Sequence, residues 1–334
     1  MSAGAPDEFD LIARLFAPLA QSYAGALGLG DDAALMDVPA GQQLVLTMDS
    51  MVAGVHFFAD DPPDLIARKL VRVNLSDLAA KGAKPFAIML AAAFPQGTDE
   101  AWLTGFGQGL AMDTQAFSLA LIGGDTVATP GPLTLTVTAF GLLPHGQARL
   151  RSGARPGDDI WFSGTVGDSA LGLWVRQGRM GKLAAGHRQF LERRYLLPQP
   201  RLGLAEGLRS LAHAAMDVSD GLVQDLGHLC RQSAVAAEIL VADLPLSAAA
   251  QAALEDDPSC LAALLGGGDD YEILFTAPAE HKAALLDLAE QSGIALRIIG
   301  RITAGQGVRV LDRQGQTLAI EQAGWRHFKS AGGQ

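Results

Sequence analysis

Near its N-terminus the chain carries the stretch Gly28-Leu29-Gly30-Asp31-Asp32-Ala33-Ala34, in which flexible glycines precede two adjacent carboxylates and an apolar run. Further aspartates recur beside glycines or at the edges of apolar segments, at Asp49, Asp77, Asp125, Asp168, Asp217, Asp220, Asp269 and Asp270. Two carboxylates about 4 Å apart repel by roughly 4 kcal/mol at an effective dielectric near 20. If several of these side chains converge, they need a cation among them, and a divalent metal carrying a polyphosphate is the hypothesis.

Composition narrows the class of protein. A length of 334 residues favours two domains, and a net charge of −11 with a pI near 5.0 argues against a nucleic-acid-binding surface. The only two cysteines form no CxxC motif, which suits a reducing compartment. The acidic start is unlike a secretory signal, and the apolar run at 85–94 is too short to cross a bilayer. We therefore expect a cytoplasmic enzyme with neither nucleic-acid nor membrane partners.

Hydrophobic periodicity predicts alternating helices and strands, hence an α/β or α+β fold. Predicted helices cover 9–16, 64–81, 99–114, 168–176, 220–230 and 279–292, and predicted strands cover 33–36, 44–48, 87–94, 117–122, 133–140, 159–163, 214–217, 271–276, 296–299 and 308–311. Strict alternation over 133–140 indicates a half-buried antiparallel strand. The Gly-, Pro- and Arg-rich passage at 144–157 predicts a junction between an N-terminal domain, 1–148, and a C-terminal domain, 149–334.

The strand boundaries place several aspartates where strands end, which is where α/β proteins carry their sites. Asp49 is expected to follow one strand, and Asp125 to follow another in a glycine turn. Asp77 is expected inside a helix, three residues after Asn74 on the same face. Each aspartate also has a local reading, because turns and helix caps favour this residue; Ser219 or Asp220, for example, suits the cap of the following helix.

The usual phosphate-binding motifs are missing. The sequence contains no G-x-x-x-x-G-K-[ST] loop, no protein-kinase catalytic loop and no D-x-[DN]-x-[DN]-G calcium loop. A nucleotide enzyme of this sequence would therefore hold phosphate through Mg²⁺, which takes one or two carboxylates and leaves its remaining positions to water and phosphate.

Three further residues have both a functional and a bland interpretation. His56, near Gly54, is either a ligand contact or a locally bonded histidine. Arg151 at the predicted junction is either a phosphate clamp or a surface arginine. Trp325 either stacks on a flat ligand or packs the C-terminal tail.

Taken together, the motifs resemble the thiamine-monophosphate kinase family over residues 8 to 328. The matching blocks, in chain order, are Gly28 to Ala34, Thr47-Met48-Asp49 with Gly54-Val55-His56-Phe57, Asn74-Leu75-Ser76-Asp77, Gly123-Gly124-Asp125-Thr126, Arg151-Ser152-Gly153-Ala154, Asp217-Val218-Ser219-Asp220-Gly221-Leu222 and Gly324-Trp325-Arg326-His327-Phe328. The resemblance implies ATP-dependent, Mg²⁺-dependent phosphorylation of thiamine monophosphate to thiamine diphosphate, by direct in-line transfer without a covalent intermediate. It also implies the two-domain fold of aminoimidazole-ribonucleotide synthetase-like proteins, whose N-terminal sheets pair across a homodimer.

The resemblance also assigns roles. It implies several Mg²⁺ ions bound by Asp32, Thr47, Met48 (through its backbone), Asp49, Asp77, Asp125, Asp217 and Asp220. It implies ATP contacts from Gly124, Asp125, Arg151 and Ser219, with Arg151 as charge stabiliser. It places His56, Asp269 and Trp325 at thiamine monophosphate. Asp31, by contrast, is expected either to support its own turn or to support the metal ligands from behind them.

Two positions depart from the family pattern. Asp269 stands where the family usually has glutamate, and Lys81 stands where methionine is expected, at a helix end where it should face solvent. The alternatives are an aminoimidazole-ribonucleotide or selenophosphate synthetase-like enzyme, or a non-catalytic Mg-nucleotide-binding protein. Selenophosphate synthetases need a reactive Cys near the N-terminus, whereas Cys230 and Cys260 both lie in the second half.

Overall fold

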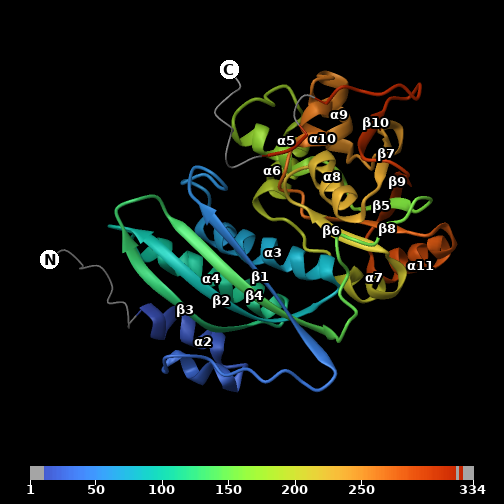
Figure 1. Ribbon diagram of the computed structural model, residues 1–334. Helices are drawn as coiled ribbons and strands as arrows, with labels where there is room; N and C mark the ends of the chain where they lie inside the picture. The colour runs from blue at the N-terminus through green and yellow to red at the C-terminus, as the bar shows by residue number, and fades with distance from the viewer. Residues whose placement is uncertain (1–10, 321–322, 326–334) are drawn as a thin grey trace. The chain divides into compact units, whose positions relative to one another are not determined.

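The computed structural model describes residues 11–320 and 323–325. The chain divides into two compact units (Figure 1). The first comprises Met1–Leu78 with Ala83–Ala148, and the second comprises Ala79–Gly82 with Arg149–Gln334. The division falls after Ala148, and it assigns the last turn of one long helix to the second unit.

The first unit is built on a four-stranded sheet in the order β1-β4-β2-β3. Its strands are β1 (Gln42–Val52), β2 (Lys84–Pro95), β3 (Ala120–Thr129) and β4 (Thr134–Pro144). Strand β4 runs antiparallel to both β1 and β2, which confirms the antiparallel strand expected at 133–140, while β2 and β3 are parallel. Figure 1 shows α3 (Pro63–Lys81) and α4 (Glu100–Ala116) together on one side of this sheet.

The opposite face of this sheet is covered at one end only. The short helices η1 (Ile12–Phe16), α2 (Ala17–Ala20) and η2 (Ala24–Leu29) contribute Ala20 and Ala26 to a buried cluster with Ile122 and Phe140 of the sheet. Farther along, Met48 of β1 and Val127 of β3 are exposed. The polar alternation of β4 follows from this partial cover, because its threonines lie on the less covered face.

The second unit contains a six-stranded sheet in the order β10-β7-β9-β5-β8-β6. Its strands are β5 (Asp159–Ser163), β6 (Ala214–Val218), β7 (Ala236–Leu240), β8 (Glu272–Ala277), β9 (Leu296–Thr303) and β10 (Gly307–Leu311). All neighbouring pairs are antiparallel except β10 with β7. The helices of this unit are α5 (Asp168–Arg176), α6 (Ala185–Leu196), α7 (Ala205–Leu211), α8 (Leu222–Ser233), α9 (Ala248–Asp256), α10 (Cys260–Gly266) and α11 (Lys282–Ser292).

Helices cover both faces of the second sheet, which explains why its central strands β5 and β8 are buried along their whole length. In β5, Ile160 and Phe162 pack in one buried cluster with α8, whereas Trp161 packs in another with α7 and α11. Alternate residues of a strand point to opposite faces, so a strand buried on both sides shows no polar alternation. The predicted mixed helix-and-sheet class is therefore confirmed in both units.

Several predicted boundaries are wrong, and the errors affect the site. Residues 33–36 form no strand, because the segment continues as irregular chain from η2 to β1. Asp49 lies inside β1 rather than after it. Strand β3 likewise continues through Gly123, Gly124 and Asp125 instead of ending at a turn. Strand β1 continues to pair with β4 as far as Val52, and β3 continues to pair with β2 as far as Thr129, so polar side chains alone do not mark the strand ends.

Two helix-end predictions also need correction. Lys81 does not simply face solvent: its Nζ donates a hydrogen bond to the carbonyl oxygen of Ala215, at 3.2 Å. Helix α8 is capped neither by Ser219 nor by Asp220, since Gly221 is the N-cap residue and makes no side-chain cap. Within the described part of the chain, no helix is both long and apolar enough to cross a membrane.

Candidate active site

Strand β1 and helix α3 are joined by two hydrogen bonds at predicted metal-binding positions. The Thr47 hydroxyl donates to Asp77 Oδ2 at 2.5 Å, and the Asp49 amide donates to Asn74 Oδ1 at 3.0 Å. Asn74 is fully buried, and its Nδ2 donates to the Leu70 carbonyl at 2.9 Å. The three-residue spacing of Asn74 and Asp77 places both on the helix face that meets β1. Helix α3 therefore fixes this carboxylate-bearing part of the strand.

Met48 lies between these residues and points the other way. Its side chain is 64% exposed, as alternation along the strand requires. Only its backbone can therefore take part in a site on the helix-covered face of β1.

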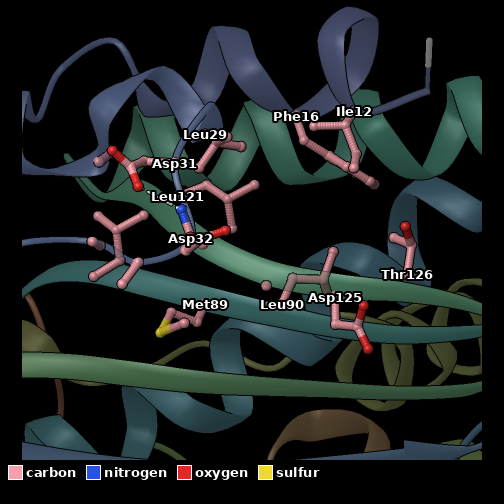
Figure 2. Close-up of a pocket in the computed structure, with 16 residues that line it drawn as sticks. Ile12, Phe16, Leu29, Asp31, Asp32, Met89, Leu90, Leu121, Asp125 and Thr126 are labelled. Carbon is pink, nitrogen blue, oxygen red and sulfur yellow. Dashed lines mark hydrogen bonds between the residues drawn. The ribbon is translucent and has the colours of Figure 1, made fainter. Parts of the chain in front are cut away.

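A pocket lies between η2, the acidic stretch after it, and strands β2 and β3 (Figure 2). Asp31, Asp32 and Asp125 supply carboxylates to its lining, and Phe16 and Leu121 are among its apolar residues. The pocket thus combines an apolar wall with acidic oxygens. Among the aspartates that were expected to converge, Asp32 and Asp125 both line this pocket.

The backbone around this pocket has positive φ angles and one close approach that few residue types allow. Leu27, Gly28 and Leu29 all have positive φ, which turns the chain sharply before the carboxylates. The Asp32 amide donates to Asp31 Oδ1 at 2.7 Å, so Asp31 does support its own turn. In β3, a Cβ on Gly124 would lie 1.9 Å from the Leu90 carbonyl oxygen, so only glycine permits the pairing of β2 with β3 here.

The sheet register separates Asp125 from Asp49. Asp125 lies in the same row as Thr136 of β4, through the intervening strand β2. Asp49 lies in the next row, opposite Val137. Because successive rows point to opposite faces, Asp49 is on the helix-covered face and Asp125 is on the other. Within the first unit, the predicted metal ligands thus form two groups rather than one.

The segment that carries His56 is held at two points. The Val52 amide donates to His56 Nδ1 at 3.0 Å, which leaves Nε2 as the protonated nitrogen of a neutral ring. The His56 carbonyl accepts a hydrogen bond from Nζ of Lys69 at 3.2 Å, and this lysine of α3 is buried. Helix α3 is therefore hydrogen-bonded both to the segment that carries His56 and to β1.

In the second unit, the turn at 219–221 is held by Asp225, a residue that was not expected to belong to the site. The amides of Ser219, Asp220 and Gly221 all donate to Oδ2 of Asp225, at 3.1, 3.0 and 3.1 Å. Burial is the main cause that raises the pKa of Asp225 to about 7, and these backbone hydrogen bonds oppose it. The signal available in the sequence was an aspartate in the first turn of α8, directly after the Ser-Asp-Gly turn.

A second turn is fused to the first. The Asp269 amide donates to the Ser219 carbonyl and the Tyr271 amide to the Val218 carbonyl, both at 2.8 Å. A Cβ on Gly268 would lie 2.3 Å from the Ser219 oxygen. Asp269 therefore lies beside the turn that carries Ser219 and Asp220, close to the end of β6, where Asp217 is nearly buried.

The conformation of Asp269 gives a physical reason for aspartate in place of glutamate. Its φ is +71°, in the left-handed region. Aspartate is several-fold enriched there among non-glycine residues, because its short side chain can bond locally.

Next to Asp269 lie two buried carboxylates, Asp270 and Glu272, for which no role was expected. Asp270 accepts hydrogen bonds from the amides of Gly167, at 2.5 Å, and Ser169, at 3.2 Å, around the start of α5. Burial, the largest cause, raises its pKa to about 8. Glu272 accepts from Arg194 Nη2 at 2.7 Å and from Arg201 Nε at 2.6 Å. These contacts support the turn that carries Asp269. In the sequence, the only signal for Asp270 and Glu272 was their position at the start of an apolar strand.

The remaining predicted residues of the second unit lie around α8. The Arg151 side chain is exposed, and its carbonyl accepts a hydrogen bond from the Ser233 hydroxyl at 3.1 Å. The Trp325 amide donates to the Asp220 carbonyl at 2.9 Å, and its side chain is 47% exposed. His327 and Phe328 of the C-terminal motif lie outside the described residues.

The second unit thus brings Ser219, Asp220, Asp269 and Trp325 around one pair of turns. Across residues 11–320 and 323–325, no three histidine, cysteine, aspartate or glutamate side chains form a ready metal-binding group. Mg²⁺ does not require one, since it usually binds one or two protein carboxylates and completes its shell with water and phosphate.

Comparison with protein families gives two adjacent matches. Residues 30–143 match the AIR synthase related protein N-terminal domain, and residues 155–313 match the corresponding C-terminal domain. The chain is 42% identical over 329 residues to thiamine-monophosphate kinase of Caulobacter vibrioides, which covers 98% of this chain and 92% of that protein. It is also 42% identical to the same enzyme of Escherichia coli K12, covering 96% and 98% respectively.

Solved structures give the same picture. Thiamine-monophosphate kinase from Stenotrophomonas maltophilia K279a superposes with a TM-score of 0.81 at 43% identity, covering 91% of this chain and 98% of that one. The structure described as AaThiL complexed with AMPPCP and TMP gives a TM-score of 0.77 at 31% identity, covering 90% and 91%. The hydrogenase maturation protein HypE of E. coli reaches 0.77 at only 20% identity, which shows a shared fold alone.

Proposed function

Because this chain belongs to the thiamine-monophosphate kinase family, we infer that it transfers the terminal phosphoryl group of ATP to thiamine monophosphate and releases thiamine diphosphate and ADP. The observation that carries this conclusion is 42% identity to such kinases over nearly the full length of both proteins. The complex of a related chain with AMPPCP and TMP supports both substrates.

We propose that Asp32, Thr47, Asp49, Asp77, Asp125, Asp217 and Asp220, with the backbone of Met48, bind several Mg²⁺ ions. The donors fit this ion, because all are hard carboxylate, hydroxyl or carbonyl oxygens. The hydrogen bond from Thr47 to Asp77 places two such donors side by side. Bound Mg²⁺ would neutralise the charge on the phosphate oxygens during transfer.

We also propose that the pocket between η2 and β3 forms part of the ATP site, with contacts from Gly124 and Asp125. Its apolar lining suits an adenine ring, and its carboxylates suit a metal-screened polyphosphate rather than a bare one. We propose Ser219 and Arg151 as further contacts to ATP. The Ser233 bond to the Arg151 backbone supports this role, since it holds the base of a flexible side chain.

The reaction needs little covalent help from the protein. A phosphate oxygen of thiamine monophosphate is already a nucleophile, so neither a strong base nor a covalent residue is required. The residues of the chain therefore hold the two phosphates in line and stabilise charge, with Arg151 as the fixed cation. His56, Asp269 and Trp325 would position thiamine monophosphate, and an indole suits a flat, positively charged ring.

We propose further that two copies pair through the open face of the first sheet. Leu46, Met48 and Val127 expose 57%, 64% and 51% of their surface on strands of this sheet. Leu46 and Met48 lie two residues apart on one face of β1, and exposed apolar side chains on a strand face are typical of a surface that another sheet covers. We also place the enzyme in the cytoplasm, a location supported by two free, buried cysteines.

The direct test is coupled detection of ADP with thiamine monophosphate as acceptor, and with thiamine and an aminoimidazole precursor as controls. Mg²⁺-dependent release of ADP with thiamine monophosphate alone is expected. Equal or faster ADP release with either control would overturn the substrate assignment.

A further inference from the structure

One side chain of α8 contacts two segments that the proposed function uses. Nε2 of Gln224 donates a hydrogen bond to Asp220 Oδ2 at 3.0 Å and another to the Trp325 carbonyl at 2.8 Å. A side-chain amide nitrogen carries two hydrogens, so this pair of bonds uses both. Gln224 thus links a predicted metal ligand to the residue predicted to contact thiamine monophosphate.

The backbone on either side reinforces this link. The Gln224 amide donates to the Ala323 carbonyl, and the Trp325 amide donates to the Asp220 carbonyl, both at 2.9 Å. The first bond is available because amides in the first turn of a helix have no partner within it. A Cβ on Gly324 would lie 2.4 Å from Gln224 Cβ, so the segment 323–325 lies directly against the start of α8.

The contacts of Gln224 are separate from those that stabilise the helix. Helix α8 buries Leu226, Leu229 and Cys230 in the core of the second unit, whereas Gln224 is only partly buried. Methionine has a similar shape and a similar helix propensity. Replacing Gln224 with methionine therefore removes both donors without disturbing the core.

We propose that Gln224 is a positioning residue that couples Trp325 to Asp220, so that the aromatic ring at the substrate and the metal-binding carboxylate are held in one arrangement. The inference rests on the proposed function, because it assumes that Trp325 contacts thiamine monophosphate. It assigns to Gln224 a specific effect on that substrate, exerted through Trp325, and a separate effect on Mg²⁺, exerted through Asp220.

The first test needs neither metal nor turnover. In the Gln224→Met variant, the backbone carbonyl of Trp325 loses its hydrogen bond from Gln224, so iodide should quench the Trp325 part of the fluorescence more strongly, by up to roughly twofold in Stern–Volmer slope because 47% of the residue is already exposed. Subtracting the signal of a Trp325→Phe protein isolates this part. Gln251→Met is the matched control, since Gln251 also donates from a helix to a backbone carbonyl, that of Leu246, but on α9. Quenching in Gln224→Met equal to that of the control would refute the proposal.

Steady-state kinetics then separate positioning from general stability. Each lost hydrogen bond is worth about 1 kcal/mol, so the KM for thiamine monophosphate should rise roughly fivefold to tenfold, and the Mg²⁺ concentration for half-maximal rate should also rise. In a Trp325→Ala background, Gln224→Met should leave the KM for thiamine monophosphate within about twofold, because the two changes act through one contact. Multiplicative effects on that KM would contradict the proposal. Gln224→Leu, which also removes both donors and adds no charge beside Asp220, should behave like Gln224→Met and provides a second variant.

Failure of the proposed function and failure of the anchoring role of Gln224 give different experimental results. If the wild-type protein releases no ADP with thiamine monophosphate, the proposed function fails, while the quenching experiment still decides whether Gln224 anchors Trp325. If the wild-type protein is active and neither the quenching nor the KM changes in Gln224→Met, the anchoring role alone is refuted.

Discussion

Replacement of Asp225 tests how the turn at 219–221 is held. All three amides of this turn donate to the same oxygen of Asp225, at 3.0 to 3.1 Å. Asp225→Asn can keep an oxygen in that position, whereas Asp225→Ala leaves three amide groups without their acceptor. The comparison therefore separates the need for an acceptor from the need for a charge.

The magnitude follows from the burial of the donors. Gly221 is buried, so loss of the partner of its amide should cost about 1 to 3 kcal/mol. Ser219 and Asp220 are only partly buried, and water can replace part of their bonds, so each should cost about 0.5 to 1 kcal/mol. The local free energy of opening should fall by about 3 kcal/mol in Asp225→Ala and by less than about 1 kcal/mol in Asp225→Asn.

Hydrogen–deuterium exchange of a peptide that spans the turn measures this quantity directly. A loss of about 3 kcal/mol accelerates exchange by roughly a hundredfold. Turnover should fall in parallel in Asp225→Ala, since Ser219 and Asp220 lose their fixed geometry, and should stay near the wild-type value in Asp225→Asn. Equal exchange in the alanine and asparagine variants would refute the reasoning, because it would show that the acceptor oxygen does not hold the turn.

Three further predictions concern the metal ligands, a buried carboxylate and the open sheet face. Asp49→Asn and Asp217→Asn should each cut turnover by at least about a hundredfold and raise the Mg²⁺ requirement; a Mg²⁺ titration checks this, and near wild-type rates at limiting Mg²⁺ would contradict the metal-binding roles. Burial raises the pKa of Asp270 from 3.8 to about 8, so the folded protein retains a proton that the unfolded chain loses, and this group lowers stability as pH rises from about 4 to about 8. Thermal unfolding of Asp270→Asn should consequently depend less on pH over that range than wild type, and an unchanged pH dependence would exclude the shift. Met48→Lys places a charge on the open sheet face, so light scattering should detect a shift from dimer to monomer, whereas Leu286→Lys, on an exposed position of α11, should leave the mass unchanged.

The sequence predicted local structure well where a single segment contains its own signals. The helices expected at 64–81 and 99–114 are present as α3 (Pro63–Lys81) and α4 (Glu100–Ala116). Asp77 and Asn74 were expected on one face of the first of these helices, and both contact β1.

Several missed features depend on contacts between distant segments. The partners of Asp270 and Glu272 lie 71 to 103 residues away in the sequence, and only the fold brings them together. The partners of Asp225 are local, at 219–221, but an aspartate near the start of a helix also suits an ordinary first-turn position. The ends of β1 and β3 were misplaced because polar side chains were taken to end strands, whereas both strands continue to pair beyond them. Separation of Asp49 from Asp125 depends on sheet register, which the position of each aspartate in the sequence does not specify.

The most direct test of the central conclusion is phosphorus NMR of the products formed from ATP and thiamine monophosphate with Mg²⁺. We expect the single phosphorus resonance of thiamine monophosphate to be replaced by the two coupled resonances of thiamine diphosphate, in step with conversion of ATP to ADP. Release of inorganic phosphate from ATP while the thiamine monophosphate resonance persists would contradict it, because the protein would then hydrolyse ATP without phosphorylating this acceptor.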